Sequence, residues 1–292
     1  MLFASHTVYW KILTRLIPCV KLIDALSFTV NRALIFLLAL VSLQVFGQDN
    51  ENSQKLTPSV SIFAGLVHVR TTDVGLSFNR LLLSGTGVPL SVRYQLEASK
   101  HMTEFQFDYY NVPLSHKQAN IPVSLTHGLL SLAHTRSIQT SNLGSKRVQI
   151  LLGLRLGTNI NYLDSPSLDN GDVLVINALH IVVKSKVTLD ESKTLTFSAA
   201  LPTIALAKRL VFDGGLHEPA SNESKTMQIL YRDSKLVFAN SYAFSVEYAA
   251  KLSNIIFWVS SYNFNYVRND NIEPIKIYTN ELITGFRFNL KK

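Results

Sequence analysis

The chain has 292 residues, of which 16% are charged and 10% aromatic, and its formal net charge of +8 is spread along the sequence. A charge this mild and dispersed gives no argument for a nucleic-acid-binding role. After Gly47 no apolar run reaches the roughly 18 residues that a transmembrane helix needs, which excludes a polytopic helical membrane protein. The only cysteine is Cys19, so the sequence predicts neither a disulfide framework nor thiolate chemistry.

The N-terminal region has the layout of a secretory signal peptide. A basic residue precedes an apolar run at 33–46, and a small residue and polar residues follow it. We interpret residues 30–47 as a cleaved signal peptide, with translation starting at Val30, and residues 1–29 as an extension upstream of the true start. The alternative is an uncleaved anchor helix, for which the apolar run is short. The polar residues 48–58 predict a flexible lead-in.

The region 59–292 is predicted to form the barrel, because apolar and polar residues alternate at period two in successive runs within it, which is typical of half-buried β-strands. In the stretch 103–112, for example, Phe105 and Phe107 stand on one face and Glu104 on the other. The predicted strands are 60–70, 88–99, 103–112, 124–136, 147–162, 173–189, 194–211, 235–251, 254–269 and a final run that ends at Leu290.

The connections between these strands alternate in length. Short ones separate the long ones, which are expected near 71–87, 113–122, 164–172, 213–225 and 269–274. A membrane barrel with both termini on one side has this parity and an even strand count. The sequence therefore predicts an all-β fold, an antiparallel up-and-down transmembrane β-barrel of about ten strands, with eight or twelve as alternatives.

Three details of this strand assignment stay open. The segments 75–83 and 227–231 could each be an extra strand, which would give a barrel of about twelve. Pro202 lies inside a predicted strand and removes a backbone donor there, so it predicts either a bulge or an earlier strand end.

The chain closes with the alternating segment Phe286-Arg287-Phe288-Asn289-Leu290, followed by Lys291-Lys292. Together with the signal peptide and the alternating strands, this ending resembles the small outer-membrane β-barrel proteins of Gram-negative bacteria. The resemblance covers about Gln48 to Leu290 and concerns architecture, without matching a functional subfamily. It implies contact with outer-membrane lipid and lipopolysaccharide, and insertion by the barrel-assembly machinery. A soluble β-sandwich or lipocalin-like carrier stays open, because alternation alone does not distinguish lipid from a protein core.

Charged residues recur on the strand face that would line the barrel interior. They carry both signs, and unpaired charges in a narrow interior are costly. We therefore interpret them as a structural network of salt bridges, with a selective pore or a ligand site as the alternative. The predicted lumen-facing set is Arg93, Glu97, Glu104, Asp108, Arg155, Lys184, Glu247, Glu281 and Arg287.

A lipid-modifying hydrolase would need a serine within hydrogen-bond reach of a histidine. His127 and Ser131 share one face of a predicted strand, and His134 lies on the other. Residues four apart on a strand are roughly 13 Å apart, so His127 would need a serine from a neighbouring strand. The sequence has no Gly-x-Ser-x-Gly, His-Glu-x-x-His or Walker motif.

Two further groups could bind ligands. His180, Lys184 and Lys186 share a face and could attract a lipid phosphate, although basic residues near strand ends often snorkel to the interface. The long loop at 214–223 is the expected external recognition surface, and its His217-Glu218 pair lacks the second histidine of a metal site. We expect no metal and no cofactor.

The expected function is non-enzymatic. The barrel would act through its external loops or as a partner of another envelope protein in the outer membrane. The alternatives are a narrow pore or transporter for small solutes, and an outer-membrane lipid-modifying hydrolase. No nucleic-acid partner is expected.

Overall fold

The structure, a computed structural model, describes residues 56–73, 81–115, 123–144, 146–165, 170–212, 235–237, 241–269 and 275–290. Within these ranges no helix is long and apolar enough to cross a membrane. The predicted signal peptide, the extension before it, the loop 214–223 and the segment 227–231 lie outside them. The strands are β1 (Thr57–Asp73), β2 (Leu81–Gly87), β3 (Leu90–Glu97), β4 (His101–Leu114), β5 (Val123–Leu143), β6 (Lys146–Ser165), β7 (Asn170–Thr188), β8 (Lys193–Phe212), β9 (Lys235–Val237), β10 (Ser241–Lys251), β11 (Ile256–Asn269) and β12 (Ile275–Asn289).

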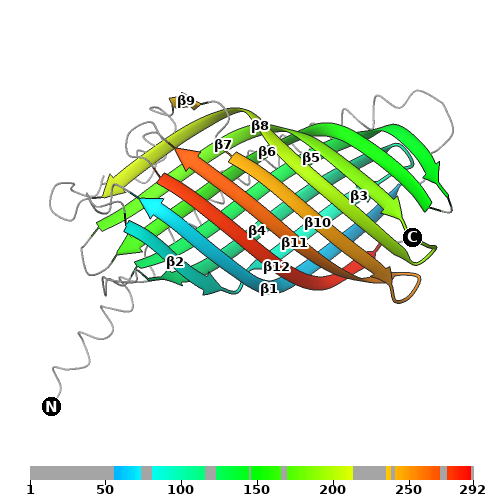
Figure 1. Cartoon of the computed structure of the whole chain (residues 1–292), viewed down its shortest axis with the longest axis horizontal. Coiled ribbons are helices and arrows are strands. Elements are labelled where there is room, and N and C mark those ends of the chain that lie inside the picture. The colour runs from blue at the N-terminus through cyan, green and yellow to red at the C-terminus, as the bar shows by residue number, and fades with distance from the viewer. Residues whose placement is uncertain are drawn as a thin grey trace, which may run out of the picture. The chain divides into compact units, whose positions relative to one another are not determined.

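The strands form a closed antiparallel barrel in which sequence neighbours pair with one another (Figure 1). The first and last strands also pair: β1 runs along β12 from Ser59 opposite Asn289 to Asp73 opposite Ile275. The predicted all-β, up-and-down barrel is therefore confirmed.

The twelve labelled strands occupy ten positions around the barrel. β2 and β3 share one position, because both pair with β1 in one register, with Val67 opposite Gly87 and Ala64 opposite Leu90. β9 and β10 both lie along β8. The predicted count of ten is confirmed, and the alternatives of eight and twelve are wrong.

The second strand position begins earlier than predicted. It starts at Leu81 and not at Val88. Val88-Pro89 only interrupts this strand between β2 and β3, and both parts pair with β1 in the same register. The described end of the segment 75–83 therefore belongs to this position and adds no strand. Pro202 lies at a register shift in the pairing of β7 with β8, which is the predicted bulge.

The two ends of the barrel differ. Leu56 and Leu290 both lie at one end, which also carries Gly144 and the short turns 98–100, 189–192 and 252–255. We call this the terminal end, and we call the opposite end, where the connections are longer, the loop end. In the turn 189–192 Asp190 accepts hydrogen bonds from the backbone and hydroxyl of Ser192, and these bonds lower the pKa of Asp190.

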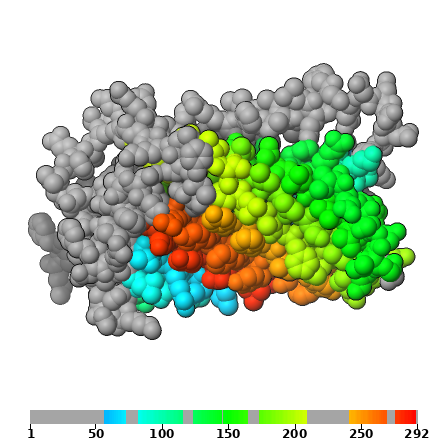
Figure 2. Space-filling model, turned by 45° about the horizontal axis from the view of Figure 1, so that its top comes forward, coloured from blue at the N-terminus to red at the C-terminus, as the bar shows by residue number. Residues whose placement is uncertain are grey.

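The outward face of the barrel is apolar. On β6 the outward Leu152, Leu154 and Leu156 are 42%, 52% and 48% exposed, whereas the inward Leu151 is 4% exposed. Exposed apolar side chains also lie on β1, β12, β11 and β10, among them Ile62, Leu282, Tyr262 and Phe244. These strands form part of the outer surface that Figure 2 shows. An apolar exterior around charged interior positions suits lipid and not water, which argues against the soluble sandwich and the lipocalin-like carrier.

Two glycines allow β1 and β12 to approach closely. A Cβ added at Gly65 would lie 2.0 Å from the backbone oxygen of Leu282, and one at Gly285 would lie 1.9 Å from that of Ile62. Any larger residue would push the two strands apart. Closure of the barrel therefore depends on these glycines.

Candidate functional site: the barrel lumen

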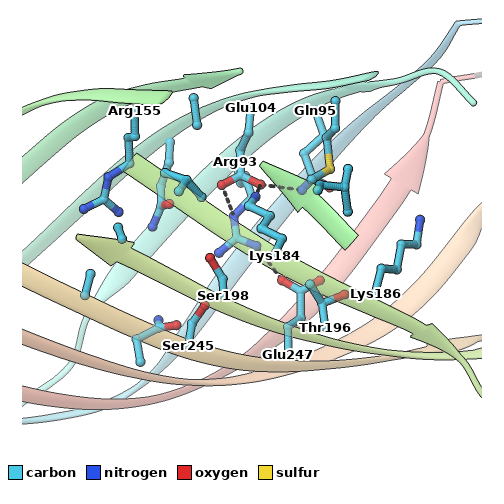
Figure 3. Close-up of a pocket in the computed structure, with 18 of the residues that line it drawn as sticks. Arg93, Gln95, Glu104, Arg155, Lys184, Lys186, Thr196, Ser198, Ser245 and Glu247 are labelled. Carbon is cyan, nitrogen blue, oxygen red and sulfur yellow. Dashed lines mark hydrogen bonds and ion pairs between the residues drawn. The ribbon is translucent and has the colours of Figure 1, made fainter. Parts of the chain in front are cut away.

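The inward residues of the terminal-end half surround a cavity of about 90 Å³ (Figure 3). The side chains that line it come from most of the barrel strands, and Figure 3 shows Arg93, Glu104 and Glu247 pointing toward one another. The structure brings all the charged residues that the sequence assigned to the lumen to this one cavity: Arg93, Glu97, Glu104, Asp108, Arg155, Lys184, Glu247, Glu281 and Arg287.

Ion pairs cross the centre of the lumen. Glu247 on β10 accepts hydrogen bonds from Arg93 on β3 and, at 2.5 Å, from Arg287 on β12. Glu104 on β4 lies 3.1 Å from the Nζ of Lys184 on β7 and 3.9 Å from the Nε of Arg93. Only β3 and β4 among these pairs of strands are neighbours in the sheet, so the contacts of Glu247 with Arg93 and of Glu104 with Lys184 join separate parts of the barrel wall across the lumen.

A second group, deeper in the cavity, is held by neutral partners. Asp108 accepts a hydrogen bond of 2.7 Å from Gln106, and Glu281 accepts one of 3.2 Å from Asn263. Among the described residues the Nε of Arg155 is buried and has no hydrogen-bond partner. This part of the lumen is polar but less tightly paired than the central network.

Solvent reaches the lumen from the terminal end. Lys186 and Glu97 pair near the short turns, and their side chains are 24% and 43% exposed. The side chain of Glu104, farther in, is 11% exposed. The cavity thus forms a vestibule that is most accessible at the terminal end.

The loop-end half of the lumen is filled by apolar side chains. Seventeen buried residues, drawn mostly from the loop-end halves of their strands, form one cluster, which we call the apolar plug. Its members are Val67, Val69, Leu83, Tyr110, Val112, Leu114, Val123, Leu125, Leu163, Leu174, Ile176, Ala178, Ala205, Ala207, Val267, Ile275 and Ile277.

His127 and Ser131 both face the lumen and are buried. The Nδ1 of His127 lies 2.8 Å from the Oδ1 of Asn161, and the ring stacks on Tyr110 at 4.4 Å between centroids. In some catalytic triads an amide orients the histidine base in this way, but a triad also needs a nucleophile on the other ring nitrogen. Within the described part of the chain, no hydrogen bond joins this histidine to Ser131, so the structure does not bring the two candidate residues together.

His180, Lys184 and Lys186 face the lumen and not the lipid, which corrects the expectation that this group meets headgroups. Both lysines pair with glutamates inside the barrel. The Nε2 of His180 lies 2.8 Å from the Oγ of Ser241 on β10.

Sequence reasoning missed the pairing of His180 with Ser241. Alternation assigned each residue to a strand face, but β8 lies between β7 and β10, so no local pattern connects them. Within the described residues, no group of three or more His, Cys, Asp or Glu side chains could hold a metal ion. His217 and Glu218 lie outside those residues.

Neither a protein family model nor a curated protein matches the sequence. Among solved structures, the outer-membrane protease OmpT from Escherichia coli is similar, with 8% identity, a TM-score of 0.51, and 82% of this chain and 99% of that chain covered. The fold is that of an outer-membrane β-barrel.

Neisserial surface protein A is also similar, with 11% identity, a TM-score of 0.35, and 79% of this chain and 97% of that chain covered. The Ail protein of Yersinia pestis is similar with 11% identity, a TM-score of 0.29, and 79% of this chain and 98% of that chain covered. At such identities the likeness concerns the fold alone.

Proposed function

We propose that this chain is an integral barrel of the outer membrane that conducts no solute and acts through its external loops or as a partner of another envelope protein. Export would use the signal peptide at 30–47, which is cleaved. The apolar exterior, the even number of strand positions and the alternation of short and long connections support this location, with the loop end facing outward.

The observation that carries this proposal is the filled lumen. Barrels of about eight strands have interiors that side chains just fill, and an open aqueous channel appears at about sixteen. Here, in a barrel of ten strand positions, ion pairs cross the terminal-end half and seventeen apolar residues fill the loop-end half. An ion that entered the vestibule would have to lose its water to pass the apolar plug.

Conductance in a planar bilayer tests the proposal. The refolded barrel is expected to give no unitary current steps at moderate voltage and salt. Its folded state is verified separately by the difference in gel mobility between boiled and unboiled samples. Stable, reproducible unitary steps from the folded barrel would contradict the proposal and favour the narrow pore.

The hydrogen bond between His180 and Ser241 favours a second candidate, a lipid-modifying hydrolase, because it places a hydroxyl on a histidine at catalytic distance. Labelling with a fluorophosphonate probe separates the two functions. The non-enzymatic proposal predicts no labelling of the folded barrel. Labelling that disappears in Ser241→Ala, together with loss of ester hydrolysis, would establish the enzyme instead.

A further inference from the structure

The hairpin of β5 and β6 extends past the neighbouring strand β4 at the terminal end (Figure 1). β4 begins at His101, which is opposite Arg136 of β5. β5 continues beyond that point, paired with β6 on its other side, as far as Leu143. Residues 138–143 therefore form a strand edge, roughly 20 Å long, that no described strand covers on the side of β4. We call this segment the free edge.

An open groove lies where β4 would continue along the free edge. The pairing of β5 with β6 shifts register between Ser137 and Gln139, and such a bulge bends its strand. The groove has a volume of about 270 Å³ and is lined by the turn before β4, at Lys100, and by the start of the free edge, at Ile138 and Thr140. It leaves room for another extended chain beside β5.

The free edge lies beyond the apolar band and is exposed. His134 and Arg136 alternate on β5 with buried residues, so both point outward, and two polar side chains there mark the end of the lipid-facing surface. Beyond them every residue of the free edge is exposed, with Ile138 at 61% and Leu143 at 73%. This segment is accessible from water at the terminal end.

The sequence of the free edge does not protect it from pairing. Proteins usually block an exposed edge with charged residues or proline. The segment 138–143 reads Ile-Gln-Thr-Ser-Asn-Leu and contains neither. An uncharged, exposed edge with apolar residues is a template on which another chain can add a strand.

Two residues of the free edge turn their backbone groups away from β6. Leu143 is opposite Lys146 across the turn of the hairpin, where the first residue of a turn accepts a hydrogen bond from the last. Residues that bond one neighbour alternate along a strand with residues that face the other side. The N–H and C=O groups of Thr140 and Asn142 therefore point to the open side, where an added strand would meet them.

The charges around the groove select the kind of chain that fits. Lys100 and Arg147 line the groove, and none of its described lining residues is acidic. Arg136 and Lys146 are exposed close by on the same two strands. Complementary charge favours a partner with acidic side chains over a basic one.

We propose that the free edge binds an extended, acidic segment of another envelope protein, which adds as a strand beside β5 in the periplasm. Backbone bonds to Thr140 and Asn142 supply the pairing, and Lys100 and Arg147 supply the preference for acidic side chains. The inference rests on the proposed function, in which the terminal end faces the periplasm and the barrel acts with a partner. It adds the surface that binds and the chemistry of the partner.

Fluorescence anisotropy with a labelled peptide and the purified full-length chain in detergent tests the pairing. The probe is a peptide of about ten residues that alternates glutamate and valine, a length that covers the free edge. The variant Thr140→Pro/Asn142→Pro removes two donors from the open side and leaves the basic residues in place. It is expected to bind the probe at least about tenfold more weakly than the wild type. Equal binding by both would overturn the inference.

Charge reversal tests the preference for an acidic partner. The wild type is expected to bind the probe more tightly than the same peptide with lysine in place of glutamate, and Lys100→Glu/Arg147→Glu is expected to reverse this order. The matched control Lys193→Glu/Lys251→Glu reverses two exposed charges at the same end and is expected to bind like the wild type. Equal binding of both peptides by the wild type would overturn the inference.

Other occupants of the free edge give different results. A barrel that is dimeric in light scattering until Thr140→Pro/Asn142→Pro is introduced would show a second copy on the edge. Binding that appears only after deletion of residues 48–55 would show that the chain's own N-terminal segment competes for it. Either result overturns the inference. Failure of the proposed function appears instead as unitary current steps or as loss of the heat-dependent gel shift, which peptide binding does not affect.

Discussion

The two halves of the lumen use the same backbone pattern for different purposes. In the terminal-end half the inward positions are charged and form ion pairs across the lumen, and the vestibule is open to solvent. In the loop-end half the inward positions are mostly apolar, and buried polar side chains among them, such as His127 and Asn161, hydrogen-bond to each other. The first half holds opposite walls together, and the second blocks passage. The comparison shows that a small barrel can be sealed by burial of apolar side chains as well as by salt bridges.

The largest effect is expected in the charged half, from Glu247→Gln. This change removes the shared anion of Arg93 and Arg287 and leaves two cations facing each other inside the barrel. Loss of one partner of a buried pair lowers the free energy of unfolding by about 3–5 kcal/mol. Denaturant unfolding in detergent measures it, with Glu191→Gln in an exposed turn as the control. A loss of unfolding free energy no larger than that of the control would show that the ion pairs of Glu247 do not stabilise the barrel.

An intermediate effect is expected in the apolar plug, from Ile176→Ala. Ile176 is 1% exposed, so the truncation leaves a cavity among packed side chains and lowers the free energy of unfolding by about 2–4 kcal/mol. The control, Ile181→Ala, shortens an outward side chain on the same strand that is 40% exposed, and a smaller loss is expected there. If the two variants lost equal stability, the plug would not be packed as described.

The smallest effect is expected at the rim of the vestibule, from Glu97→Gln. The side chain of Glu97 is 43% exposed, so its pair with Lys186 is screened by solvent and contributes about 0.2–1 kcal/mol. The difference from wild type in denaturant unfolding should shrink further in high salt. If Glu97→Gln lowered the free energy of unfolding as much as Glu247→Gln does, the rim of the vestibule would be closed to water.

Much of this architecture could be predicted from the sequence, because a strand pattern of period two reports which face each residue occupies. Alternation in β3 and β4 placed Arg93 and Glu104 in the lumen, and the lengths of the connections indicated the even strand count. The merging of β2 with β3 could not be predicted, since Val88-Pro89 has the appearance of a strand start.

The partners across the lumen were also beyond the sequence. Glu104 pairs with Lys184 three positions around the barrel, and such a contact depends on strand tilt and stagger. The apolar plug did leave a signal. Around Leu174 and Ile176 the strand is apolar on both faces, with Val173 and Val175 pointing outward, and strands that are covered on both faces show such runs.

Thiol labelling tests the sealed lumen most directly, because Cys19 is the only native cysteine. In a Cys19→Ser background, Ser245→Cys introduces a thiol on the wall of the vestibule, and Ala178→Cys introduces one in the apolar plug. A charged maleimide added to the folded barrel in detergent should label the Ser245→Cys variant and leave the Ala178→Cys variant unreacted until the barrel is boiled. Comparable labelling of both folded variants would show a water-filled lumen and contradict the sealed barrel.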